Sequence, residues 1–146
     1  MINRNLGHIK FYLDGSLLSS GNVRTTDTLS SSNPLRIGGT QEINSNYQSF
    51  HGSIDNLRIY DYAINQDLVS EIYEIESNAS ISIVNFSNQL PDGLHAYYKL
   101  DGNADEETDN GYDGSLTGTG NDPTNAPDRF NRPNRAYYFD GNDRLK

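Results

Sequence analysis

The sequence predicts a mostly β protein with one short helix. Charged residues make up 21% and hydrophobic residues 34% of the 146 residues, while Gly, Asn, Ser and Asp are abundant. This composition suits short strands joined by polar turns. In addition, the hydrophobic period changes partway through residues 51–73, which indicates a strand that runs into a helix.

The strand expected at residues 52–60 places Asp55, Leu57 and Ile59 on one face, and the Leu57 face is the predicted core side. Asn65 suits the N-cap of a helix near residues 65–75. Apolar residues recur there at helical spacing, so this stripe is expected to lie on a sheet. The stripe consists of Leu68, Val69, Ile72, Tyr73 and Ile75.

Other apolar runs bounded by turn residues predict further short strands. They lie at residues 8–13, 17–18, 34–38, 94–100, 115–116 and 135–139. Residues 81–86 read either as a strand or as a linker, and residues 40–50 and 119–128 as loops. Asp14-Gly15 predicts a hairpin turn, because Gly tolerates the positive φ that a tight turn needs.

Charge and composition exclude several classes of function. The net charge of −9 argues against nucleic-acid binding. No run of 18 apolar residues occurs, and no apolar segment follows residues 1–4, so the chain as given is expected to have neither a membrane-inserting segment nor a signal peptide. The absence of cysteine excludes disulfides, thiolate metal sites and cysteine nucleophiles.

Six motifs resemble the laminin G-like, concanavalin A-like jelly-roll family. Three of them are similar to motifs of the family's C-terminal half: residues 11–15 (FYLDG), 35–39 (LRIGG) and 52–60 (GSIDNLRIY) with Ala63-Ile64. Three others are similar to motifs of its N-terminal half: residues 94–100 (LHAYYKL), 101–114 and 136–141 (AYYFDG). The resemblance therefore implies an antiparallel β-sandwich whose halves occur in reversed order.

This order implies three segments. Residues 1–76 are expected to be a C-terminal half, residues 77–91 a connector, and residues 92–146 an N-terminal half, with the family's central strands missing. The chain is then either an incomplete piece cut across two tandem domains or one permuted sandwich. The connector is long enough for strand 94–100 to pair beside strand 52–60, so we expect the two halves to pack together as one domain.

The acidic residues 101–113, with six acids and no base, are the candidate for an ion site. Calcium takes six to eight hard oxygens, and Asp101 and Asp109 would contribute carboxylates. The resemblance further implies a structural calcium held by Glu106 in this loop and by Asp55 on the strand. The alternative is a solvated acidic loop with Asp55 at the surface.

Sugar binding generally needs an exposed aromatic ring with polar neighbours. Tyr47, Tyr62 and Tyr112 lie in or near predicted loops and are the candidate ligand-binding residues. The other tyrosines fall mostly in strands, where one of each adjacent pair is expected in the core. The lack of Trp weakens the case for a sugar site.

The sequence gives little support for catalysis. The Glu-x-Asp-x-x-Glu strand of retaining glycosidases on this fold class does not occur, and the three His residues are not at zinc-ligand spacing. We therefore expect a non-enzyme. The resemblance implies an extracellular binding module that recognises glycan or protein at a cell surface, beside neighbouring domains of a larger bacterial surface or secreted protein. The alternatives are a structural spacer and, third, an accessory domain of a glycoside hydrolase.

Overall fold

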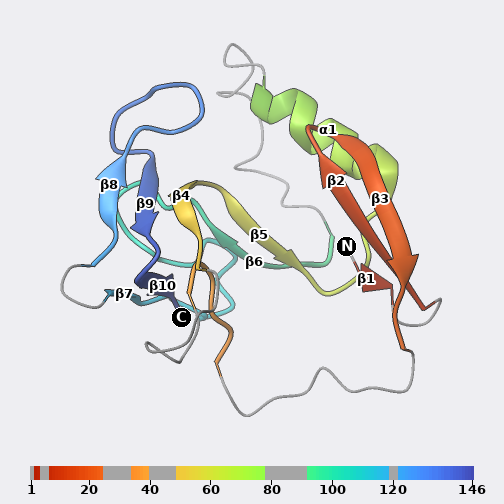
Figure 1. The fold of residues 1–146 in the computed structure, drawn as a ribbon, viewed down its shortest axis with the longest axis horizontal. Helices are drawn as coiled ribbons and strands as arrows, with labels where there is room; N and C mark the ends of the chain where they lie inside the picture. Colours follow the sequence, from red (N-terminus) through yellow and green to blue (C-terminus); the bar gives the residue numbers. More distant parts are fainter. Residues whose placement is uncertain (1, 4–6, 25–33, 40–48, 78–91, 119–121) are drawn as a thin grey trace. The chain divides into compact units, whose positions relative to one another are not determined.

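The computed structural model describes residues 2–3, 7–24, 34–39, 49–77, 92–118 and 122–146 (Figure 1). The described residues form ten strands and one helix. The strands are β1 (Ile2–Asn3), β2 (His8–Leu13), β3 (Ser16–Asn22), β4 (His51–Ile54), β5 (Leu57–Tyr60), β6 (Leu94–Tyr98), β7 (Leu116–Gly118), β8 (Thr124–Ala126), β9 (Ala136–Asp140) and β10 (Asp143–Leu145), and the helix is α1 (Gln66–Ser77).

The strands form small sheets, in the orders β1-β2-β3, β4-β9-β8, β10-β7 and β5-β6. The first three sheets are antiparallel throughout. These antiparallel sheets with one short helix confirm the predicted fold class, and they are consistent with a concanavalin A-like β-sandwich.

The chain divides into two compact units, each described by itself. Unit 1 takes residues 1–30 and 60–94, and unit 2 takes residues 31–59 and 95–146. Each unit therefore draws on both sides of the connector predicted at 77–91. The domain boundaries expected from the resemblance stay a prediction.

Unit 1 is built on the hairpin of β2 and β3. Asp14 and Gly15 both have positive φ, at 48° and 73°, which confirms the predicted tight turn. Helix α1 is anchored to this turn, because Gln66 Nε2 and Ser70 Oγ both donate to the carbonyl oxygen of Gly15, at 2.7 and 3.2 Å. A side chain on Gly15 would collide with the Tyr73 ring, so the turn needs glycine for space as well as for φ.

The start of α1 agrees with the sequence. The Asn65 side-chain oxygen accepts a hydrogen bond from the backbone N–H of Leu68 at 2.8 Å, as an N-cap does. In the predicted stripe, Tyr73 is 40% exposed and the remaining members are partly buried.

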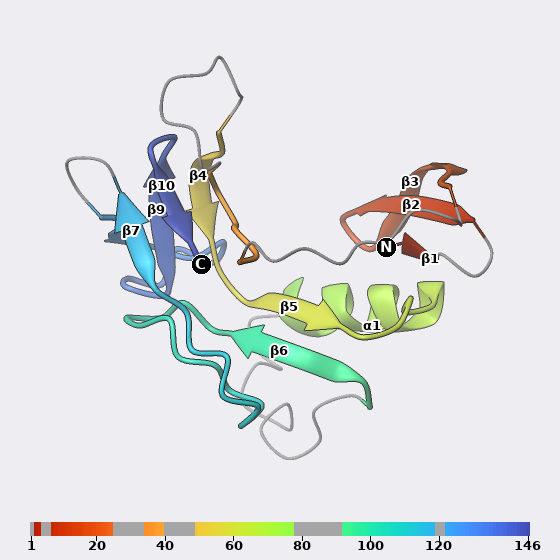
Figure 2. The same cartoon turned by 90° about the horizontal axis from the view of Figure 1, so that it is seen from below.

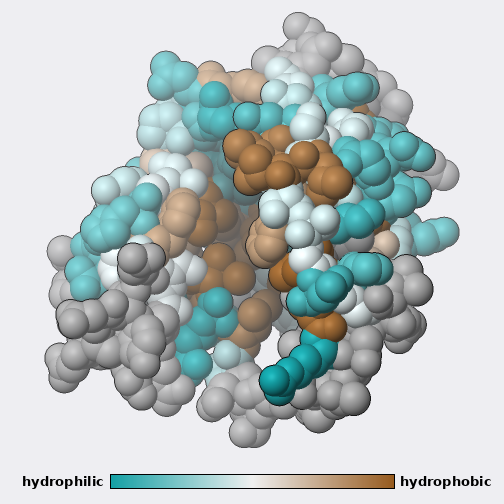
Figure 3. Space-filling view, turned by 45° about the vertical axis from the view of Figure 1, so that its right-hand side comes forward, coloured by the Kyte–Doolittle hydropathy of each residue, from teal (hydrophilic) through white to brown (hydrophobic). Residues whose placement is uncertain are grey.

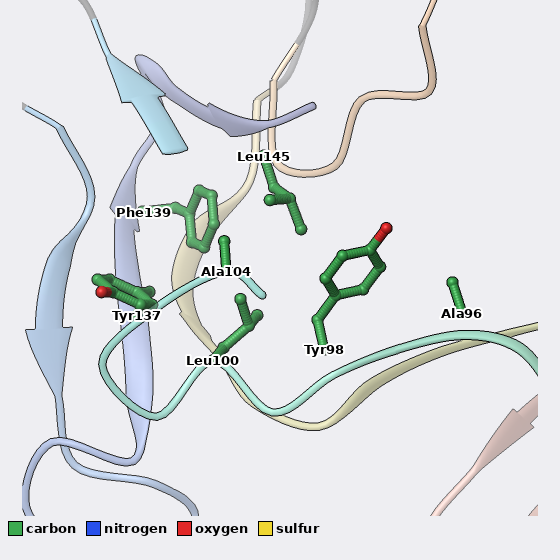
Figure 4. Packing of buried hydrophobic residues seen from close by; sticks show 7 residues of the cluster. All are labelled: Ala96, Tyr98, Leu100, Ala104, Tyr137, Phe139 and Leu145. Atoms are coloured by element: carbon green, nitrogen blue, oxygen red, sulfur yellow. The ribbon is translucent and has the colours of Figure 1, made fainter. Parts of the chain in front are cut away.

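The core of unit 2 gathers around β9. Phe139 is fully buried and Leu100 nearly so. Figure 4 shows their side chains together with those of the other buried residues, which come from β6, the loop after it, β9 and β10. These other residues are Ala96, Tyr98, Ala104, Tyr137 and Leu145.

Strands from both sides of the connector pair with each other. β4 pairs antiparallel with β9, with Gly52 opposite Phe139, and β5 pairs with β6. Figures 1 and 2 both show β5 and β6 side by side. The pairing of strand 94–100 beside strand 52–60 that the connector length allows is therefore confirmed.

The strand predicted over residues 52–60 is in fact two strands. Asn56 has φ of 49°, which breaks the extended backbone between β4 and β5 and lets each strand take a different partner. Leu57 and Ile59 pack against the core as predicted. Ile54, expected on the opposite face, packs there too, because the break resets the alternation.

Two other expectations need correction, and a third is not tested by the described residues. Residues 34–38 form no strand but a single bridge, Ile37 with Leu145, since Gly38 turns the chain with φ of 89°. The predicted loop at 119–128 contains β8, an edge strand beside β9, and β10 follows the Asp-Gly turn after β9. Residues 81–86 lie outside the described residues.

Several apolar side chains lie at the surface. Figure 3 shows one face, where hydrophobic patches lie among hydrophilic side chains. Phe11, Leu13, Leu17 and Leu18 of the β2–β3 hairpin are about half or more exposed. None of the described residues forms a helix long and apolar enough to cross a membrane.

Candidate functional site

The acidic loop 101–113 folds around the buried carboxylate of Glu106. Oε1 accepts hydrogen bonds from the backbone N–H groups of Tyr97 at 3.1 Å and Thr108 at 2.7 Å. Oε2 accepts one from the N–H of Asn110 at 3.0 Å. In return the backbone N–H of Glu106 donates to Asp113 Oδ1 at 2.9 Å. One side chain thus holds two loop amides and one amide of β6.

These hydrogen bonds outweigh the cost of burying the charge. Burial alone would raise the pKa of the Glu106 carboxyl, but the hydrogen bonds from Thr108 and from the three backbone N–H groups hold that pKa below its ordinary value. Glu106 is therefore a structural anion of the loop.

The other acids of the loop have separate partners. Asp101 accepts from Arg135 Nη1 at 2.7 Å, and Glu107 pairs with Lys99 Nζ at 2.7 Å. Asp109 is exposed at a left-handed backbone position with φ of 62°.

Asp55 meets a guanidinium. Its two oxygens accept hydrogen bonds from Arg129, Oδ2 from Nε at 3.2 Å and Oδ1 from Nη2 at 2.5 Å. The Asp55 side chain is 13% exposed, so this ion pair is partly shielded from water.

Three of the four predicted calcium ligands are already engaged by N–H donors in this arrangement. Glu106 and Asp55 already use both carboxylate oxygens to accept N–H donors, whose positive ends would face a bound cation, and Asp101 has its own arginine. Among the described residues, no three His, Asp or Glu side chains gather in a group that would hold a metal ion.

Tyr112 forms an exposed aromatic platform with His95. The two rings lie with centroids 5.1 Å apart and planes tilted by 35°, and Tyr112 is 50% exposed. We call this pair, with Asn110 beside it, the Tyr112–His95 surface. It belongs wholly to unit 2.

Hydrogen bonds fix the backbone under both rings. The carbonyl oxygen of His95 accepts from Asn110 Nδ2 at 3.0 Å and from Thr108 Oγ1 at 3.3 Å. The carbonyl oxygen of Tyr112 accepts from the hydroxyl of the buried Tyr98 at 2.7 Å. Burial first, and then the charges of Glu106 and Asp113, raise the pKa of Tyr98, so its hydroxyl stays a proton donor.

The two other candidate tyrosines differ from Tyr112. Tyr62 belongs to unit 1, is 47% exposed, and lies edge-on to Tyr60 with ring centroids 6.1 Å apart. Tyr47 lies outside the described residues. Of the candidate tyrosines that the structure describes, Tyr112 has an exposed ring, His95, beside its own. The backbone carbonyls of both residues accept hydrogen bonds.

His95 and Arg129 were missed by sequence reasoning. His95 was considered only among three His residues that lack zinc-ligand spacing, and Arg129 lies between the loop predicted at 119–128 and the strand predicted at 135–139. The contacts of both residues depend on the folded chain: His95 meets Tyr112 where the loop folds back onto β6, and Arg129 meets a carboxylate 74 positions away.

Comparison with known families agrees with the motifs found at residues 11–64. Residues 1–70 match the model of the concanavalin A-like lectin/glucanases superfamily. The match confirms the laminin G-like resemblance over that stretch, which runs from β1 into α1. The resemblance of residues 94–141 to the opening strands of such a domain stays a prediction.

The laminin G-like match bears on function at a coarse level. It indicates a carbohydrate- or protein-binding module. Domains of the laminin G-like family are typically extracellular and non-catalytic. Comparisons with curated proteins and with solved structures found no match.

Proposed function

We propose that this chain is a non-catalytic glycan-binding module and that the Tyr112–His95 surface holds the sugar. The observation that carries the proposal is an aromatic pair that is exposed while the backbone beneath each ring is hydrogen-bonded. A ring that is already ordered loses little entropy on binding, and its apolar face suits the C–H face of a sugar. Asp109 and Asn110 bring polar atoms for hydroxyl groups.

The setting of the module follows from the family. We propose that it works at a cell surface or in a secreted protein, beside other domains of a larger parent chain. A purely structural spacer is the competing function, and a protein ligand is the competing partner. The Tyr112–His95 surface favours binding over a spacer role, since a spacer has no use for an ordered exposed aromatic pair.

We expect Tyr112→Ala to weaken glycan binding by about thirty-fold or more. The substitution removes the exposed ring but leaves the backbone carbonyl that Tyr98 holds, so the fold should be kept. A sugar that stacks on a tyrosine contacts the whole face of the ring. Loss of one such residue commonly costs about 2 kcal/mol or more of binding free energy, a fall in affinity of roughly thirty-fold. Screening on a glycan array, followed by calorimetry on the strongest hit, measures it.

The matched control is Tyr62→Ala. Tyr62 has nearly the same exposure but lies in unit 1 and stacks edge-on with Tyr60. Binding that survives Tyr112→Ala and is lost with Tyr62→Ala would move the site to unit 1. Binding of no sugar by the unmodified chain would favour the spacer, and binding of a surface protein alone would replace glycan by protein as the partner.

The charge around the platform predicts the class of sugar. Residues 101–113 contain six acids and no base, and the nearby cations Lys99 and Arg135 are each paired with one of these acids. We therefore expect neutral or amino sugars to bind and sialylated, uronic or sulfated glycans to be rejected, most strongly at low ionic strength. An array read at low and high salt tests this, and enrichment of acidic glycans would contradict it.

A further inference from the structure

Asp55 occupies the point where the chain leaves one strand and enters another. β4 ends before it and β5 begins two residues later. The following residue, Asn56, is fixed from β6: its side-chain oxygen accepts from the Tyr97 hydroxyl at 2.6 Å, and its N–H donates to the Lys99 carbonyl at 3.2 Å. The Asp55 carboxylate is therefore held at a defined place in unit 2 rather than on a free surface.

Arg129 reaches this carboxylate from a distant segment. The two residues are 74 positions apart, and the guanidinium uses Nε and Nη2 together, one for each oxygen of Asp55. A planar fork that meets a carboxylate with two N–H groups is the strong geometry for this kind of pair. The pair ties the β4–β5 junction to the loop between β8 and β9.

A second carboxylate shapes the loop that presents Arg129. Asp128, whose side chain is 1% exposed, accepts from the backbone N–H groups of Phe130 and Arg132 at 2.9 Å each and from Arg132 Nε at 2.6 Å. Burial acts to raise the pKa of Asp128, but these hydrogen bonds, with the Arg132 charge, hold it below its ordinary value. Arg129 thus projects from a turn that is closed by hydrogen bonds on its own loop.

We infer that Arg129 is the built-in cation of this site, standing where the resemblance implies calcium, and that unit 2 folds without a metal ion. Both oxygens of Asp55 are taken by the guanidinium, and the oxygens of Glu106 are taken by three backbone N–H groups. A calcium ion at either carboxylate would have to displace these donors, and at Asp55 it would also meet the arginine charge.

The first test needs no substitution. Thermal melts of the full chain, recorded with excess calcium and with excess chelator, are expected to give the same Tm. A Tm that rises by several degrees in calcium would overturn the inference and support the calcium site predicted from the sequence.

The second test removes the guanidinium. Arg129→Gln is expected to lower Tm by on the order of 5 °C in both calcium and chelator, because Asp55 is left partly buried without its counter-ion. Arg129→Lys keeps the positive charge but loses the pair of N–H groups that binds both oxygens of Asp55, so its Tm is expected between those of the unmodified chain and Arg129→Gln. The lysine variant also provides the test if Arg129→Gln does not fold. The matched control is Arg135→Gln, which breaks the more exposed pair with Asp101 and should lower Tm by less.

Two results of the second test would contradict the role of Arg129. One is an equal fall in Tm for Arg129→Gln and Arg135→Gln, which would make the Asp55 pair an ordinary surface ion pair. The other is a Tm for Arg129→Gln that calcium restores to the value of the unmodified chain, which would show that the site prefers the metal once the arginine is gone.

Discussion

Replacing Phe139 by alanine is expected to destabilise unit 2 by about 3–5 kcal/mol, the range for a large aromatic removed from a packed core. Phe139 is fully buried on β9, the strand that pairs with both β4 and β8. Its ring also fills the space left by Gly38, where a side chain would come within 2.7 Å of it. Urea unfolding followed by circular dichroism measures the loss.

Phe50→Ala is the matched control. Phe50 lies edge-on to Phe139, with ring centroids 6.5 Å apart, but is 45% exposed. Because nearly half of its surface already faces water, we expect a smaller loss of about 1 kcal/mol. Equal losses for the two variants would show that Phe139 is not at the centre of the core.

Most apolar runs that met a clear turn were predicted correctly as strands, although residues 34–38 form only a single bridge. Residues 8–13 coincide with β2, and Asn65 marks the start of α1. The strand at 52–60 could not be divided into two from the sequence, because the break depends on the positive φ of Asn56. Asn tolerates this backbone conformation, but an Asn in a strand pattern does not by itself predict it. β8 has too few apolar residues to be seen without its neighbour β9.

Adjacent tyrosines show the same limit. Of Tyr137 and Tyr138, the first is buried and the second 43% exposed, as alternation predicts. Tyr97 and Tyr98 are both buried, although only Tyr98 belongs to the core cluster. β6 is covered on both faces: Tyr98 packs in the core, while Tyr97 lies under the Arg58 guanidinium at 4.5 Å.

The candidate site was predictable in part. Composition indicated the acidic loop, and position in a predicted loop indicated Tyr112, because both signals are local in the sequence. The partners were not predictable, since Arg129 and Arg135 reach carboxylates 74 and 34 positions away. His95 meets Tyr112 only where the loop folds back onto β6. The number of acidic residues alone does not distinguish a carboxylate that can bind a metal ion from one that already accepts hydrogen bonds from N–H groups.

Stability and binding meet in the Glu106 carboxylate. It holds the N–H groups of Thr108 and Asn110, and the side chains of these same residues donate to the carbonyl of His95. A change at Glu106 should therefore loosen the loop beneath the Tyr112–His95 surface without touching either ring.

We expect Glu106→Gln to cost about 2–3 kcal/mol of unfolding free energy at pH 7, since the amide cannot accept all three hydrogen bonds and places a donor against an N–H group. The pKa of Glu106 lies below its ordinary value of 4.5 in the folded chain. Its stabilising contribution is therefore fully present above pH 4.5 and is lost as the pH falls through the folded pKa. The difference between the two chains should shrink accordingly in acid.

Glu107→Gln provides the matched control, one residue along the same loop. Its carboxylate is more exposed and pairs with Lys99 at the surface, so the expected loss is below about 1 kcal/mol. Urea unfolding of the three chains at pH 7, 5 and 3.5 separates the effects, because comparison with the unmodified chain cancels the pH response of Asp128. If Glu106→Gln costs the same at every pH, or no more than Glu107→Gln, the buried carboxylate is not what holds the loop and its aromatic platform together.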